Sequence, residues 1–451
     1  MKIIRKNIWR NYTENIDNVV KWSFWNDFIP YEGGVICFNT SSGAIVLFDA
    51  EEYSKYKEKP SLLPDTFAQF GIIVSGNLDE KQEWCAEYRR GKEDASFLDL
   101  TILSTQQCQF KCVYCFEGEK GNKTLTDETS AAIKSFLEKR AGTFNKLRVA
   151  WFGGEPLLEV ERIRELSAFF LDFCKKHNIS YYADVTTNGY ALNPSKCEIF
   201  FNECNIKRYI ITVDGIAAVH DKRRPLRNGA GTFDVIWNNI VTLVNIGAGV
   251  TIRVTIDKVN AGNVKELIDR IAESEIARKT GLMFVRTIDY LYTPDSVKDT
   301  IYKSEEFAPI EMELIEYAHS KGILEYATPR PCPLGGCLRK GDIVIGTKGE
   351  IYKCLDTVGE EQWITGDISG DNENSGAGWY RDWLSWEPSA NATCAECKLQ
   401  PLCNGGCPHN ALFASKKHGT DTQCPDWKFN YKKNVQLYTQ KRLQLHEYQE
   451  V

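Results

Sequence analysis

Strand-like and helix-like segments alternate through the middle of this chain, and this alternation restricts its fold more than any other feature. Six short runs rich in branched apolar residues are expected to be strands: residues 98–103, 147–152, 181–186, 208–213, 250–256 and 282–288. Between them, apolar residues recur at helical spacing in residues 127–140, 158–177, 232–246 and 263–274. Repeated strand–helix units build a parallel sheet, and a closed barrel needs eight of them. The sequence therefore predicts an α/β fold, a partial (β/α)6 TIM barrel.

Three cysteines with the spacing C-x3-C-x2-C follow the first predicted strand: Cys108, Cys112 and Cys115. Sites in parallel α/β folds lie at the carboxyl ends of the strands, so this loop would place three thiolates at the mouth of the barrel. Four thiolates close an iron–sulfur cluster, whereas three leave one iron open. A zinc site that lacks its fourth ligand, or plain buried cysteines, are the alternatives on spacing alone.

Small and polar residues follow the later predicted strands. The second strand is followed by Gly153, Gly154, Glu155 and Pro156, and the third is followed by Thr187 and Asn188. The fourth contains Thr212, and the fifth contains Arg253. Glycines allow close approach of the backbone, and hydroxyl, amide and charged side chains suit a polar ligand. Each short motif alone is equally typical of a tight turn.

Taken together, these motifs resemble those of the radical S-adenosylmethionine (SAM) enzymes. The resemblance implies that the three cysteines hold a [4Fe–4S] cluster whose open iron binds the methionyl group of SAM. It also implies that Tyr114 lies beside the adenine, that Gly153-Gly-Glu-Pro156 contacts the amino group, that Thr187, Asn188 and Thr212 contact the ribose and carboxylate, and that Arg253 contacts the carboxylate.

Eight of the sixteen cysteines lie from residue 332 onward: Cys332, Cys337, Cys354, Cys394, Cys397, Cys403, Cys407 and Cys424. Eight equals two sets of four, and either iron–sulfur clusters or zinc ions accept four thiolates. The spacing resembles the SPASM extension of peptide-modifying radical SAM enzymes. This resemblance implies two auxiliary [4Fe–4S] clusters, the inner one held by Cys332, Cys337, Cys354 and Cys407 and the outer one by Cys394, Cys397, Cys403 and Cys424.

Residues 1–95 differ in pattern from the rest. Residues 34–39 and 43–48 are expected to form a hairpin, and Asp49 is expected to cap a helix. A small sheet with an exposed edge can accept a peptide as an added strand, or it can be a packing domain without a ligand. We therefore expect three parts: a small α+β domain that resembles a leader-peptide-recognition domain (1–95), the barrel (96–305), and a bridge with a SPASM domain (306–451).

Composition excludes other classes of function. The net charge of −6 argues against nucleic acid as the main partner. The amino-terminal residues have no apolar core of signal-peptide length, and no run of about 18 apolar residues is present, so we expect a cytoplasmic protein without a membrane partner.

The resemblance implies an oxidoreductase that uses SAM and three [4Fe–4S] clusters, and that receives electrons from a flavodoxin or ferredoxin. Its substrate would be a precursor peptide with a leader sequence, in which it installs a thioether or carbon–carbon crosslink, as sactipeptide and ranthipeptide synthases do. An anaerobic sulfatase-maturating enzyme, which makes formylglycine, is one alternative, although it usually lacks a unit like residues 1–95. A multi-cluster electron-transfer protein is another, but it would have no need of a SAM pocket.

Overall fold

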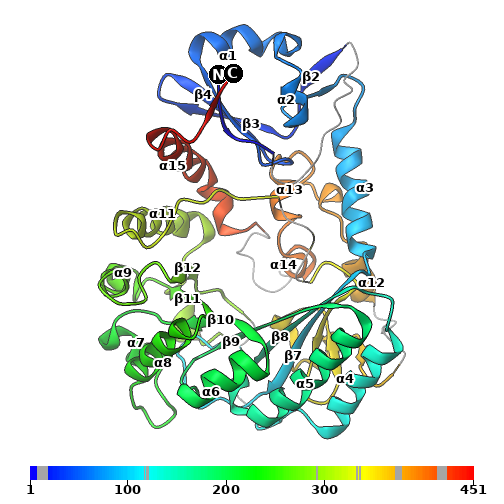
Figure 1. The fold of residues 1–451 in the computed structure, drawn as a ribbon, viewed down its shortest axis with the longest axis vertical. Helices are drawn as coiled ribbons and strands as arrows, with labels where there is room; N and C mark the ends of the chain where they lie inside the picture. Colours follow the sequence, from blue (N-terminus) through cyan, green and yellow to red (C-terminus); the bar gives the residue numbers. More distant parts are fainter. Residues whose placement is uncertain are drawn as a thin grey trace.

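The computed structural model describes residues 1–7, 19–115, 117, 121–290, 293–331, 334, 337–370, 378–413 and 424–451. One large and one small sheet lie at opposite ends of the molecule, and helices connect them along both sides (Figure 1). Cys332, an expected cluster ligand, lies outside the described residues.

The large sheet contains the six predicted parallel strands in chain order. They are β7 (Phe97–Thr105), β8 (Lys146–Gly153), β9 (Ser180–Thr187), β10 (Ile206–Thr212), β11 (Gly249–Ile256) and β12 (Thr280–Arg286). Each strand pairs in parallel with its sequence neighbour. The predicted α/β fold with a partial barrel is confirmed.

Helices cover the outer face of this sheet (Figure 1): α4 (Asp127–Lys139), α5 (Val160–His177), α6 (Pro194–Glu198), α7 (Ala217–Arg223), α8 (Phe233–Asn245) and α9 (Val264–Ala272). Thr126 caps α4 by accepting a hydrogen bond from the Thr129 backbone N–H. Successive strand residues point to opposite faces. In β8, Val149 and Trp151 join the core beneath the helices, while Arg148 and Phe152 border the inside of the barrel.

Three further strands extend the large sheet beyond β7. Strand β13 (Asp342–Ile345) pairs in parallel with β7, and β14 (Glu350–Tyr352) and β15 (Gly366–Asp367) follow in antiparallel pairing. The cysteine-rich region is thus attached to the barrel by backbone hydrogen bonds, an arrangement that the sequence analysis did not predict.

The small sheet has the order β16-β1-β5-β4-β3. Its strands are β1 (Lys2–Arg5), β3 (Asn26–Tyr31), β4 (Gly34–Asn39), β5 (Ile45–Asp49) and β16 (Gln449–Glu450), and β2 (Val20–Trp22) pairs separately with β6 (Ile73–Ser75). The predicted hairpin is β4–β5, and Asp49 caps α1 (Ala50–Lys57) with a reciprocal bond from Glu52. The two chain ends lie side by side because β16 pairs with β1 (Figure 1).

The remaining helices are α2 (Thr66–Gln69), α3 (Glu80–Glu93), α10 (Asp295–Lys298), α11 (Ser304–Ser320), α12 (Gly378–Ser385), α13 (Gln400–Cys403), α14 (Pro408–Phe413) and α15 (Tyr431–Gln444). The small sheet and the carboxyl-terminal region share one apolar core, in which Ile29 and Phe38 meet Leu399, Leu402 and Val435. Within the described residues, no helix has the length and apolar character needed to cross a bilayer.

Candidate active site

A cavity of about 140 Å³ opens at the carboxyl ends of the barrel strands. It is bordered by most of the residues that the sequence analysis singled out for the first cluster and SAM: Cys108, Cys112, Tyr114, Cys115, Gly153, Gly154, Thr187, Asn188, Thr212 and Arg253. These residues come from five loops or strand ends and meet only in the folded chain. We call this space the cofactor pocket.

Gly153 and Gly154 hold the end of β8 against the cysteine loop. A Cβ atom on Gly154 would lie 2.4 Å from the carbonyl oxygen of Gln107, and Gly153 has a φ of +127°. The backbone N–H of Gly154 donates to the carbonyl of Thr105 at 2.9 Å, and that of Glu155 donates to Gln107 at 2.7 Å. The two glycines therefore fix the position of the loop that carries the three cysteines.

Glu155 lies behind the pocket wall rather than in it. Its fully buried carboxylate accepts hydrogen bonds from the Thr187 hydroxyl at 2.6 Å and from the backbone N–H of Asn188 at 2.7 Å. Burial raises the pKa of Glu155, and these hydrogen bonds oppose that rise. Pro156 is buried too, and its carbonyl accepts from Ser104. Neither residue borders the cavity; Glu155 positions Thr187 and Asn188, which do.

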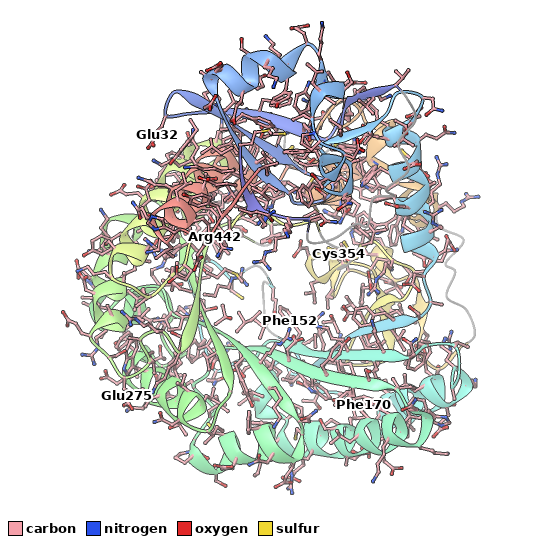
Figure 2. The ribbon with its side chains drawn as sticks, turned by 45° about the horizontal axis from the view of Figure 1, so that its top comes forward. Glu32, Phe152, Phe170, Glu275, Cys354 and Arg442 are labelled. Carbon is pink, nitrogen blue, oxygen red and sulfur yellow. The ribbon has the colours of Figure 1, made fainter. Side chains whose placement is uncertain are left out.

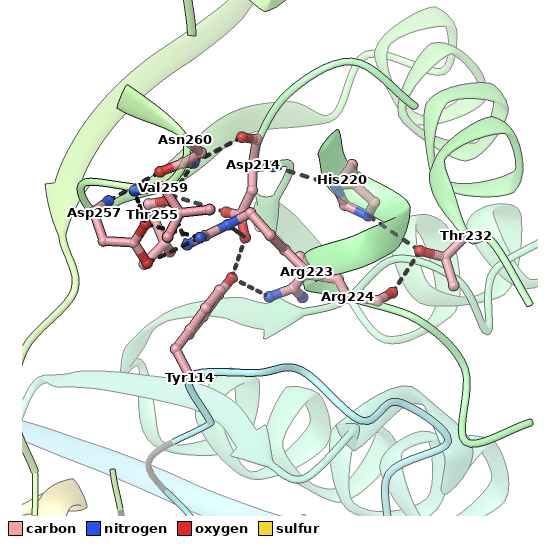
Figure 3. Close-up of polar contacts among 10 residues, drawn as sticks. All are labelled: Tyr114, Asp214, His220, Arg223, Arg224, Thr232, Thr255, Asp257, Val259 and Asn260. Atoms are coloured by element: carbon pink, nitrogen blue, oxygen red, sulfur yellow. Dashed lines mark hydrogen bonds and ion pairs between the residues drawn. The ribbon is translucent and has the colours of Figure 1, made fainter. Parts of the chain in front are cut away.

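Tyr114 lies at the centre of a buried charge network (Figure 3). Its hydroxyl donates to the carboxylate of Asp214 and accepts from Nη1 of Arg224 at 2.8 Å. Arg223 pairs with Asp257 at 2.9 Å and lies over the Tyr114 ring, 5.0 Å from its centre. Burial raises the pKa of Tyr114, so the phenol keeps the proton that it donates to Asp214.

Asp214 therefore connects Tyr114 to strand β11 and to helix α7 through hydrogen bonds. Its second carboxylate oxygen accepts from the backbone N–H of Thr255, and its own N–H donates to Nδ1 of His220 at 3.2 Å. Arg224 borders the cofactor pocket directly. Of the four cations in residues 222–227, Lys222 and Arg227 are exposed, whereas Arg223 and Arg224 are buried.

The pocket offers donors that no described residue satisfies. Nε of Arg253, Nε of Arg224 and the Thr287 hydroxyl are buried and have no hydrogen-bond partner in the described part of the chain. All three residues border the cofactor pocket. Buried donors without partners are rare in folded proteins, so a ligand with acceptor groups is expected there. Three thiols beside two guanidinium groups fit an iron–sulfur cluster and the carboxylate of SAM.

A second and larger cavity, of about 940 Å³, adjoins the first and fills the inside of the barrel. Four residues border both cavities, namely Phe152, Thr186, Arg286 and Ile288. Opposite the barrel, its wall contains Cys337, Cys354, Cys403, Cys407 and Cys424. In Figure 2, Phe152 and Cys354 lie on facing sides of the centre of the molecule.

The carboxyl-terminal thiols lie in two groups. Burial, with a smaller contribution from the neighbouring Cys397, Cys394 and Cys424, raises the pKa of Cys403 to about 12. Burial likewise raises the pKa of Cys354, to which Cys337 and Cys407 add. No group of three or more ligands in the described residues lies close enough to hold a single metal ion. The assignment of these cysteines to an outer and an inner cluster stays a prediction, and Cys332 lies outside the described residues.

Several residues of the site were not found from the sequence. Thr287 and Ile288 follow β12, Arg286 ends it, and Tyr290 comes shortly after; all four border the cofactor pocket. The only signal available was their place at or just after the end of the sixth predicted strand, 282–288. Phe110, between the first two cysteines of the motif, also borders the pocket and lies beneath the Arg224 guanidinium at 5.7 Å.

Comparison with known proteins agrees with this arrangement. The model of the radical SAM superfamily matches residues 102–271. A cysteine-type anaerobic sulfatase-maturating enzyme of Clostridium novyi is 26% identical over 371 residues, which cover 74% of this chain and 94% of that enzyme.

Two kinds of solved structure share the fold. The structure of anSMEcpe with bound AdoMet and Cp18Cys peptide has a TM-score of 0.58 and 17% identity, and the match covers 76% of this chain and 99% of that one. Streptococcus suis SuiB bound to its precursor peptide SuiA has a TM-score of 0.54 and 16% identity, and the match covers 90% of this chain and 99% of that one.

Proposed function

Because residues 102–271 form a radical SAM domain, we propose that this chain is a peptide maturase that installs a crosslink, a cysteine thioether, in a ribosomally made precursor peptide. The cavity of about 940 Å³ that shares a wall with the cofactor pocket carries this proposal. A space of that size beside the cofactor suits several residues of a peptide. Structures with the same fold contain peptides: Cp18Cys in anSMEcpe and SuiA in SuiB.

The residues of the cofactor pocket would hold a [4Fe–4S] cluster and SAM. When bound, this pair supplies a 5′-deoxyadenosyl radical that removes a hydrogen atom from the substrate. Cys108, Cys112 and Cys115 would bind the cluster. Arg253, whose buried Nε has no hydrogen-bond partner among the described residues, would bind the carboxylate of SAM. Tyr114, held in place by Asp214 and Arg224, would present its ring face to the adenine.

The two groups of carboxyl-terminal cysteines would hold auxiliary clusters on the far side of the substrate cavity. In this position they can accept the electron that the substrate radical loses when the new bond forms. Hydrogen removal would thus take place on the barrel side of the cavity, and electron acceptance on the cysteine-rich side. A flavodoxin or ferredoxin would supply the electron that starts each cycle.

The amino-terminal unit would recognise the leader of the precursor. The edge of β3 is largely occupied, because the carbonyl of Asn26 accepts from Lys398, that of Pro30 accepts from Gln436, and proline has no N–H to offer. The β2–β6 ribbon is the better candidate. Within the described residues each of its strands pairs on one side only, which leaves an edge for an extended peptide.

A sulfatase-maturating activity is the second candidate. The relative from Clostridium novyi is matched over 94% of its length, and the carboxylate of Asp356 borders the proposed substrate cavity, where it could act as a base. The small amino-terminal sheet favours the crosslinking maturase, because the match to SuiB covers 90% of this chain and the match to anSMEcpe covers 76%.

Anaerobic reconstitution followed by product analysis tests the proposal. With dithionite and SAM, the wild-type chain should release 5′-deoxyadenosine, the Cys112→Ala variant should release none, and Cys204→Ala, a change in the apolar core, should behave as wild type. The peptide encoded beside the gene should lose two hydrogens on crosslinking. Loss of a cysteine sulfur and two hydrogens with gain of one oxygen, the conversion of cysteine to formylglycine, would instead identify the sulfatase-maturating reaction. Release of 5′-deoxyadenosine by Cys112→Ala would refute the site.

A further inference from the structure

The inside of the barrel forms a slot with apolar sides and a charged floor. Phe152, Ile210 and Phe284 line it beside the cofactor pocket, and Asp99, Arg148 and Asp184 lie deeper, on β7, β8 and β9. All six side chains border the cavity of about 940 Å³. Neither the cluster ligands nor the residues assigned to SAM include any of them.

The floor holds more negative than positive charge. Arg148 donates through Nη1 to both carboxylate oxygens of Asp99 at 3.0 Å, and through Nε and Nη2 to Asp184 at 2.7 and 2.9 Å. Two carboxylates thus share one guanidinium, which leaves a net charge of about −1. Burial raises the pKa of Asp99, the Arg148 guanidinium opposes this rise, and the neighbouring Asp184 carboxylate adds to it.

The rest of the cavity wall adds no excess of positive charge that would balance the floor. Six carboxylates border the cavity (Asp99, Asp184, Glu311, Asp342, Asp356 and Asp426) and three cationic side chains do so (Arg148, Arg286 and Lys353). Arg339 lies outside the wall and pairs with Asp342, and burial raises the pKa of Glu311 to about 7, so this carboxylate is only partly charged at neutral pH. The other five carboxylates face four positive groups. An acidic side chain would be repelled from this space, and an uncharged one would leave the excess unbalanced.

The depth of the slot matches the length of a long, unbranched side chain such as lysine. Ala150 is opposite Asp184 in the β8–β9 register, and Thr186 lies two residues further along β9 in the wall shared with the cofactor pocket. Two strand residues span about 6.6 Å, and an extended lysine side chain reaches about 6 Å from Cα to Nζ. A residue whose Cα lies at the level of Thr186 can therefore place its head group at Asp184.

We propose that this slot binds the cationic side chain of a lysine or arginine of the peptide substrate. The head group would lie on Asp184 and Asp99, and the methylene stem would pack against Phe152, Ile210 and Phe284. This anchor holds the peptide backbone beside the wall shared with the cofactor pocket. The inference rests on the proposed function, since it specifies the substrate of that same site.

Binding of small probes to the reconstituted chain saturated with SAM tests the slot. The probes are N-acetyl-lysine N-methylamide, the norleucine analogue that lacks only the ammonium group, and the glutamate analogue. By anaerobic calorimetric titration the lysine probe should bind about 10-fold more tightly than norleucine, because a hydrogen-bonded charge contributes about 1.4 kcal/mol or more, and glutamate should bind most weakly.

Substitutions locate the effect. Asp184→Asn should reduce the preference for lysine over norleucine to about 2-fold, since the remaining guanidinium and carboxylate of the floor balance. Asp172→Asn, on the exposed face of α5, should leave the preference unchanged. If Asp184→Asn does not fold, as judged by thermal denaturation, Asp99→Asn makes the same test from the other side of Arg148.

Equal binding of lysine and norleucine by the wild type, or tighter binding of glutamate, would overturn the proposal. So would a full lysine preference in both the Asp184→Asn and Asp99→Asn variants. These outcomes are separate from the fate of the maturase proposal, which depends on 5′-deoxyadenosine release and on the peptide product. A chain that prefers lysine yet never cleaves SAM would retain the slot and lose the proposed activity.

Discussion

Nε of Arg286 lies 2.8 Å from Oδ1 of Asp426, and this ion pair joins the last barrel strand to the segment that follows Cys424. The Arg286 side chain is 6% exposed and that of Asp426 is 23% exposed. Arg286 also borders both cavities. The pair therefore holds the cysteine-rich region at a set distance from the cofactor pocket.

Asp426→Asn should lower the free energy of unfolding by about 2 kcal/mol, because it removes the carboxylate that pairs with the buried Arg286 guanidinium while the bond from Arg286 to the Tyr302 carbonyl stays. Anaerobic guanidinium denaturation of the reconstituted protein measures this difference. Asp382→Asn, at an exposed position of α12, is the matched control and should change the free energy by less than about 0.5 kcal/mol. Equal stability of the two variants would mean that the ion pair contributes nothing to holding the regions together.

Gly154→Ala should displace the cysteine loop, since the new Cβ would lie 2.4 Å from the Gln107 carbonyl and 2.5 Å from that of Gln106. Neither backbone oxygen can move without moving the loop that carries Cys108. The variant should reconstitute with about four fewer irons than the wild type, the content of one [4Fe–4S] cluster. Gly262→Ala meets no atom within 4 Å and should keep the full iron content. Full iron content in both variants would show that the cysteine loop still binds its cluster when a Cβ is added at residue 154.

The parallel strands could be predicted because their signal is local. Strand β11, for example, is a run of branched residues whose alternate members, Val250, Ile252 and Val254, are buried. The pairing of β13 with β7 could not be predicted, because it joins residues more than 240 positions apart through four residues of ordinary composition. The same holds for β1 and β16, which are short and are stabilised only by each other and by β5.

In the candidate site, too, residues with a local sequence signal could be predicted, and residues placed by tertiary contacts could not. The cysteine motif and the strand-end residues were predicted as a set, and the structure brings ten of them to one cavity. The burial of Arg223 and Arg224 was not predictable from their own segment, where charged neighbours resemble a solvated run. Their partners Asp214, Asp257 and Tyr114 come from other strands and loops, and only the tertiary fold reveals them.

Cys403→Ala and Cys354→Ala should each remove about four of the twelve irons expected for three clusters. The two losses should be additive in the double variant, because the thiols belong to different groups. Iron and sulfide analysis after anaerobic reconstitution gives the counts. Cys204→Ala should retain about twelve irons, since this thiol is fully buried in the apolar core of the barrel. Four irons with two zinc ions in the wild type would contradict the auxiliary clusters.

His220 should make stability fall as the pH is lowered. Burial lowers its pKa from the ordinary value of 6.5 to about 3, and Nδ1 accepts from the backbone N–H of Asp214 while Nε2 bonds to Thr232 (Figure 3). Between these two values the unfolded chain binds a proton that the folded chain does not, so the folded state is disfavoured as the pH drops below 6.5. At pH 5 the loss should be about 2 kcal/mol relative to pH 7.5.

His220→Asn separates this effect from other titrating groups. The asparagine oxygen can take the place of Nδ1 as acceptor for the Asp214 N–H, and it carries no proton at any pH in this range. Denaturant unfolding of both proteins at pH 5.0 and 7.5 gives two free-energy differences. The wild-type difference should exceed that of the variant by about 2 kcal/mol. Equal differences would mean that folding does not lower the pKa of His220. They would contradict the conclusion that the ring between Asp214 and Thr232 is neutral in the folded protein.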